Sequence, residues 1–164
     1  MSSDSRYIDI GGEKLHYLQW GSGKHLLLAF HGYGDDSNIF APIRSYIEDG
    51  YTMLSIDLPH HGRSNWDGDG KFSKETLGEL VQLLMKEFGV NKISLLGYSM
   101  GGRVSLAIMQ QMPQNIDRVA LLATDGLTVN PYYYFFTKTF VGRRVFNNML
   151  NKPDKYIRIV EMLK

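Results

Sequence analysis

The feature that most constrains this chain is the stretch Ile93–Leu106, in which a serine stands between glycines at the end of an apolar run. It predicts a short strand, a tight turn over Gly97–Gly101 and then a helix. In a G-x-S-x-G turn the serine sits on a strained strand-to-helix corner that lifts its hydroxyl above the sheet. The flanking backbones come so close that positions 97 and 101 leave no room for a side chain. The stretch therefore predicts a nucleophile at Ser99, beside the N-terminus of a helix.

Composition excludes several classes of protein. The chain has 164 residues, 43% of them apolar and 21% charged, which suits one globular core. A formal net charge of +1 gives no reason to expect nucleic acid as a partner, and the absence of cysteine excludes disulfides and thiolate chemistry. No apolar run approaches the roughly 18 residues of a membrane span, and the start lacks a secretory signal pattern. We therefore expect a cytoplasmic protein.

Strands and helices are predicted to alternate along most of the chain. Tyr7–Ile10 and Lys14–Trp20 alternate apolar and polar residues around two glycines, which predicts a β-hairpin. After the hairpin, short connections between strands and helices predict a mostly parallel sheet with helices on both faces, an α/β fold. The later strands are expected at Leu26–Phe30, Tyr51–Ile56, Lys92–Leu96 and Asp117–Ala123, and the last of them is expected to be buried. One helix is expected at Ser37–Asp49, a second from an N-cap at Ser73 to Phe88, and a third after Ser99.

The pattern changes after residue 126. Residues 127–164 do not continue the alternation of strands and helices. Gly142–Lys164 is predicted to be an amphipathic helical stretch with a break at Pro153. We therefore expect residues 1–126 to form an α/β core and 127–164 to begin a separate helical segment. The aromatic run Tyr132–Phe136 is expected to pack within that segment; lining an apolar pocket or touching a membrane are the alternatives.

Three motifs each follow one of the predicted strands, and their order along the chain is informative. His31-Gly32 comes first, the octapeptide DLPHHGRS at Asp57–Ser64 second, and the turn at Gly97–Gly101 third. Together they resemble the α/β-hydrolase superfamily, over residues 7–123. The resemblance implies an incomplete α/β-hydrolase fold and identifies the segment from Leu127 as the start of a helical cap.

The resemblance also implies roles for individual residues. Ser99 matches the family's nucleophile, and the backbone N–H groups of Tyr33 and Met100 match the two donors of its oxyanion hole. A serine at this position excludes the family branches that use aspartate. The resemblance therefore implies a serine hydrolase that acts on a small ester or related acyl compound through an acyl-enzyme, with no cofactor and no metal.

One departure from the family concerns the catalytic base. Triad order in this fold is serine, acid, histidine, yet the chain has no histidine after His61. We expect the base to come from a C-terminal part that is not in this chain, on a companion chain or fragment that also covers the open edge of the sheet. Asp125 matches either a triad acid or an Asp-Gly turn residue, and we favour the turn. Two alternative functions stay open for the chain: a non-catalytic ligand-binding or assembly half-domain, and an acyltransferase or C–C bond hydrolase.

The remaining titratable residues of the motifs are predicted to be structural. His31 is expected to tie the oxyanion loop rather than to act as a base, and His61 to brace the loop in which it lies. His60 and His61 are adjacent and do not easily converge on one metal ion. Asp57 is expected to fix its loop, and His16, in the hairpin, to lie at the surface.

Overall fold

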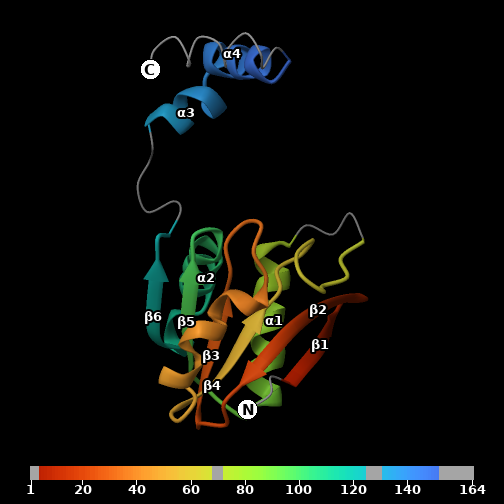
Figure 1. The fold of residues 1–164 in the computed structure, drawn as a ribbon, viewed down its shortest axis with the longest axis vertical. Helices are drawn as coiled ribbons and strands as arrows, with labels where there is room; N and C mark the ends of the chain where they lie inside the picture. Colours follow the sequence, from red (N-terminus) through yellow and green to blue (C-terminus); the bar gives the residue numbers. More distant parts are fainter. Residues whose placement is uncertain (1–3, 68–71, 125–130, 152–164) are drawn as a thin grey trace. The chain divides into compact units, whose positions relative to one another are not determined.

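The structure, a computed structural model, describes residues 4–67, 72–124 and 131–151. Six strands form one sheet in the order β1-β2-β4-β3-β5-β6 (Figure 1). Their bounds are β1 (Asp4–Ile10), β2 (Glu13–Trp20), β3 (His25–Phe30), β4 (Tyr51–Ile56), β5 (Ile93–Tyr98) and β6 (Ile116–Leu122). The pairs β1–β2 and β2–β4 are antiparallel, and β4–β3, β3–β5 and β5–β6 are parallel. The predicted hairpin and the predicted parallel sheet are confirmed.

Helices cover both faces of this sheet. The helical elements of the first 125 residues are η1 (Ser37–Tyr46), α1 (Lys74–Glu87), α2 (Met100–Gln111) and η2 (Pro113–Asn115). On one face, buried residues of α1 such as Leu80 and Leu84 pack with Leu28 and Leu95 of the sheet. On the other face, Phe40 of η1 belongs to a second buried cluster with sheet residues. The sheet thus lies between two packed layers.

The segment after β3 differs from its expected form. An α-helix over Ser37–Asp49 is the expectation, but the structure has a 3₁₀-helix that ends at Tyr46, followed by turn residues. Pro42 lies inside it and supplies no backbone N–H, which breaks the α-helical bonding pattern. The start is fixed by Asp36, whose side chain accepts from the Asn38 N–H at 2.8 Å.

Strand β6 was expected to be buried, and this expectation is wrong. No residue of β6 is fully buried, and Leu122 is 49% exposed. The reason is its position: among the described strands β6 pairs only with β5, so it forms one edge of the sheet. The expectation of an open edge at this strand is therefore met within the described part of the chain.

The chain divides into two compact units, residues 1–125 and 126–164. In the second unit, α3 (Pro131–Lys138) and α4 (Phe140–Asn151) are joined at Thr139, whose hydroxyl donates to the Phe135 carbonyl at 2.8 Å and accepts from the Gly142 N–H at 3.0 Å. The helical character expected from residue 142 holds as far as residue 151; Pro153 lies outside the described residues. None of the helices within the described ranges is both long and apolar enough to cross a membrane. The boundary at 126 and the cap role stay predictions.

Candidate active site

Ser99 occupies the corner between β5 and α2. Its φ of 50° and ψ of −114° lie in a region that residues with a side chain rarely adopt. Two backbone hydrogen bonds hold the corner: the Ser99 N–H donates to the Leu122 carbonyl at 2.9 Å, and the Gly102 N–H donates to the Ser99 carbonyl at 3.0 Å. The strained corner that the motif predicts is therefore present.

Three glycines allow this corner to close against its neighbours. A Cβ on Gly97 would lie 2.6 Å from the Gly102 Cα, and one on Gly101 would collide with the carbonyl oxygen of Phe30, at the end of β3. A Cβ on Gly102 would collide with the Thr124 side chain. The close approach expected at positions 97 and 101 is confirmed, and it brings the N-terminus of α2 against the carboxyl end of β3.

His31 lies buried at the start of the loop after β3. The Leu58 N–H donates to its Nε2 at 2.9 Å, so the ring proton sits on Nδ1, which donates to the Gly32 carbonyl at 2.7 Å. Burial lowers the pKa of His31 below its ordinary value, which keeps the ring neutral at neutral pH. Both ring nitrogens are occupied, so the expected structural role is confirmed and no lone pair is left for a serine.

The backbone of Gly32 and Tyr33 packs beside the serine corner. A Cβ on Gly32 would lie 3.1 Å from the ring of Tyr98, the residue before the serine, and 3.0 Å from Oδ2 of Asp35. The Asp35 N–H donates to the Gly32 carbonyl at 3.3 Å and closes the turn. Tyr33 itself is 84% exposed, so its side chain is not packed into the corner. The oxyanion-hole roles of Tyr33 and Met100 stay a prediction.

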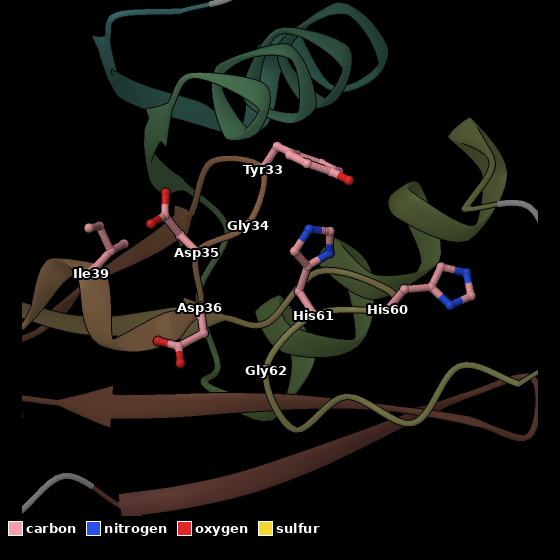
Figure 2. A pocket seen from close by; sticks show the side chains of 8 residues that line it. All are labelled: Tyr33, Gly34, Asp35, Asp36, Ile39, His60, His61 and Gly62. Carbon is pink, nitrogen blue, oxygen red and sulfur yellow. The ribbon is translucent and has the colours of Figure 1, made fainter. Parts of the chain in front are cut away.

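A cavity of about 670 Å³ opens between the loops that follow β3 and β4. Figure 2 shows the His61 ring pointing toward Tyr33 and the His60 ring pointing away, and the Tyr33 and His61 centroids lie 5.8 Å apart. Nδ1 of His61 donates to the Pro59 carbonyl at 2.8 Å, and the ring lies 5.1 Å from that of His31. His61 therefore braces its loop, as expected. The lining residues are Tyr33, Gly34, Asp35, Asp36, Ile39, His60, His61 and Gly62.

Ser99 lacks a proton acceptor in the part of the chain that the structure describes. There, no hydrogen bond joins its side chain to a histidine. Asp125, considered above as acid or turn residue, lies outside the described residues. In those same ranges no group of three His, Asp or Glu side chains is arranged to hold a metal ion. What the described corner offers is a serine at positive φ directly before the N-terminus of α2.

Asp57 is the anchor of the neighbouring loops. It is 1% exposed, and it accepts from the N–H of Ser37 at 2.5 Å, from the N–H of Arg63 at 2.8 Å and from Nδ1 of His16 at 2.7 Å. Burial alone would raise the pKa of Asp57, but these hydrogen bonds outweigh it and hold the pKa below its ordinary value. The expected loop-fixing role is confirmed, with Asp57 as a carboxylate.

His16 is the residue that the sequence reasoning missed. It was expected at the surface, but it is 1% exposed, and this expectation is wrong. β2 lies between β1 and β4, and its central residues from Leu15 to Leu18 are all buried. The sequence did contain a signal, the run Leu15-His-Tyr-Leu18. A histidine within such a run is expected to be buried, and a buried histidine needs a hydrogen-bond partner.

Comparison with known proteins points to one family. A family model described as the alpha/beta hydrolase fold matches residues 25–161. An uncharacterized hydrolase, YugF of Bacillus subtilis, is 26% identical over 98% of this chain and 64% of its own length. The pimeloyl-[acyl-carrier protein] methyl ester esterase of Proteus mirabilis is 29% identical over 68% of this chain and 41% of its own length. The chain thus spans only about two fifths to two thirds of these relatives.

A solved structure gives the same result for the fold. The epoxide hydrolase CorEH superposes with a TM-score of 0.69 at 20% identity, over 83% of this chain and 50% of that one. At this identity the likeness concerns the fold alone. It agrees with the sheet order and with the helices on both faces.

Proposed function

Because the chain belongs to the α/β-hydrolase fold family, we propose that it is the nucleophile-bearing part of a serine hydrolase that acts on an ester or related acyl compound. The observation that carries the proposal is Ser99, a non-glycine residue held at a φ of 50° between β5 and α2. Backbone strain of this kind persists where the surrounding structure enforces it, typically at functional sites. The ester esterase among the relatives supports the substrate class.

In the proposed reaction, Oγ of Ser99 attacks the carbonyl carbon of a small acyl substrate. The new O–C bond places negative charge on the carbonyl oxygen, which the N–H groups of Tyr33 and Met100 stabilise; one such donor typically contributes a factor of about 10²–10³ in rate. The serine proton passes to a histidine and then to the leaving alcohol. Water, activated by the same histidine, attacks the acyl-enzyme and releases the acid.

We place that histidine outside this chain. His31 has both ring nitrogens engaged, and within the described residues no hydrogen bond joins His61 to Ser99. The relatives extend well beyond the length that this chain matches, and β6 has one strand neighbour among the described strands. A companion chain or fragment that pairs with β6 would supply the further strands of the sheet and also the histidine base. The cytoplasm remains our expected location.

Two measurements test the proposal on the protein as it occurs in its cell. Native and denaturing masses should differ by the mass of the companion. A fluorophosphonate should label Ser99, identified by peptide mapping, and the Ser99→Ala variant should lose that labelled peptide. The Ser45→Ala variant is the matched control, because Ser45 is exposed and lies outside the site.

The outcomes separate this proposal from its alternatives. A folded assembly that leaves Ser99 unlabelled would contradict the enzyme and favour a ligand-binding or assembly half-domain. Labelling of Ser99 with no acid released from nitrophenyl esters, but with acyl groups passed to an added alcohol, would favour an acyltransferase. Release of acid supports the hydrolase.

A further inference from the structure

A second serine lies beside a histidine and an aspartate. Ser5 stands on β1, at the edge of the sheet opposite β6, and it pairs with Leu18 of β2, two positions along from the pair of Tyr7 with His16. Its Oγ lies 2.9 Å from Nε2 of His16, and Nδ1 of His16 lies 2.7 Å from Oδ2 of Asp57. A hydroxyl, an imidazole and a carboxylate in this sequence of contacts are the parts of an activated nucleophile.

The proton positions in this array follow from its chemistry. Asp57 is held as a carboxylate, which only accepts, so Nδ1 of His16 carries a proton and donates to it. In the neutral ring Nε2 then has a free lone pair and accepts from the hydroxyl of Ser5. This is the tautomer in which a histidine removes a proton from serine.

The imidazole is also rigidly placed. The ring of Tyr7 packs edge-on against it with centroids 5.1 Å apart, and the His16 main-chain N–H donates to Oγ of Ser64 at 2.9 Å. Asp57 is itself fixed by two backbone N–H groups, as described above. Ser5, in contrast, is exposed, so a reagent can reach it from solvent. A buried, oriented base behind an accessible hydroxyl is what nucleophilic attack requires.

We propose that Ser5 is a second nucleophile of this protein, activated by His16 and oriented through Asp57, and that it takes acyl or phosphonyl electrophiles with good leaving groups. With a fluorophosphonate, a bond forms between Ser5 Oγ and phosphorus, the P–F bond breaks, fluoride leaves and the serine proton moves to His16 Nε2. The proposal invokes no oxyanion hole at Ser5, and we therefore restrict the reaction to such activated reagents. The reaction needs neither Ser99 nor a companion chain.

The first test is fluorophosphonate labelling of the full chain in a Ser99→Ala background. We expect one labelled peptide, containing Ser5. The additional change Ser5→Ala should abolish it, whereas Ser45→Ala, at an exposed serine of η1, should leave it intact. His16→Gln should slow labelling by about 10²-fold or more, the usual effect of losing a general base. Labelling elsewhere, or an unchanged rate in His16→Gln, would overturn the proposal.

A second test does not depend on whether His16→Gln folds. The chain has no cysteine, so Ser5→Cys and Ser45→Cys each provide a single thiol. The thiolate attacks iodoacetamide, iodide leaves, and for Ser5→Cys the thiol proton is taken by His16. We expect Ser5→Cys to react at least about tenfold faster at pH 7, because an adjacent imidazole promotes the thiolate. Equal rates would overturn the proposal, while leaving that for Ser99 untouched.

Discussion

The corner around Ser99 is made almost entirely of main chain, whereas the array around Ser5 is made of side chains. At Ser99, two backbone hydrogen bonds and three glycines hold a residue at positive φ, and no histidine in the described residues reaches it. At Ser5, an ordinary strand residue meets an imidazole and a carboxylate. The Ser99 corner has the strained backbone but no histidine, and the Ser5 array has the histidine but no strained backbone.

The difference separates two components of serine catalysis. In our proposal the Ser99 corner contributes the main-chain N–H groups that stabilise an oxyanion, an effect that acts on the transition state through fixed dipoles. The Ser5 array has the geometry for removing a proton, which affects the nucleophile before the transition state is reached. The same chain therefore allows each component to be altered without touching the other.

The largest expected effect lies in the side-chain array. Asp57→Asn replaces a buried carboxylate that accepts three hydrogen bonds, and it leaves His16 beside an amide. A hydrogen bond to a charged group contributes about 1.5–3 kcal/mol, and asparagine cannot keep all three bonds, so we expect the free energy of unfolding in urea to fall by about 3 kcal/mol. Asp49→Asn, at an exposed position, should change it by less than about 0.5 kcal/mol. A loss below about 1 kcal/mol for Asp57→Asn would show that the array is not an anchor.

The two regions also differ in how far the sequence predicts them. The Ser99 corner is encoded by five consecutive residues, because its geometry depends on local backbone and on glycines at fixed spacing. His16 and Asp57 are 41 residues apart, and Ser5 and His16 are 11 apart, so no local pattern joins them. Their contact exists only once β2 lies between β1 and β4.

The same reasoning explains the two other errors. The length of η1 depends on how one proline is accommodated, and a helical pattern of apolar residues does not report that. β6 is predicted to be buried because Val119–Leu122 is an apolar run, but burial also depends on neighbouring elements that the strand's own sequence does not reveal. The backbone strain at Ser99 was predictable from local sequence; the order of the strands, and the burial of His16 and exposure of β6 that follow from it, were not.

The next effect concerns the main-chain corner. A Cβ at Gly101 would collide with the Phe30 carbonyl and lie 2.7 Å from that of His31, so α2 would have to move away from β3. Overpacking of this kind costs typically 1–3 kcal/mol, and we expect the upper end for Gly101→Ala in urea unfolding. Gly50→Ala is the control, since a Cβ there meets nothing within 4 Å. Equal losses in the two variants would mean that the close approach at the corner is not needed.

The pH dependence of stability separates His31 from Asp57. Both have a pKa below the ordinary value, so the unfolded chain binds more protons and stability falls with acid. The His31 contribution is complete above about pH 6.5 and is lost as the pH falls below it, with a slope of at most about 1.4 kcal/mol per pH unit. The Asp57 contribution is lost only below about pH 4.

Between pH 7 and 5 the His31 contribution can therefore be measured apart from that of Asp57. His31→Gln, which keeps an acceptor for the Leu58 N–H, should flatten the slope of unfolding free energy against pH over that window. His25→Gln, at an exposed position, is the control and should leave the slope as it is. An unchanged slope in His31→Gln would mean that the buried ring does not resist protonation.

The smallest expected effect is a gain in stability on substitution of Ser99. Ser99 has a side chain at a φ of 50°, a conformation that costs about 1–3 kcal/mol for a residue other than glycine. Ser99→Gly removes that strain, while the greater freedom of glycine in the unfolded chain takes back about 0.4–1 kcal/mol. The net expectation is a gain of about 1 kcal/mol in urea unfolding for Ser99→Gly but not for Ser99→Ala, because alanine keeps the Cβ that is strained. The matched pair Ser5→Gly and Ser5→Ala should show the opposite order, since glycine weakens a strand that is not strained. If Ser99→Gly proved no more stable than Ser99→Ala, the corner would store no strain, and the contrast between a main-chain site and a side-chain site would lose its energetic basis.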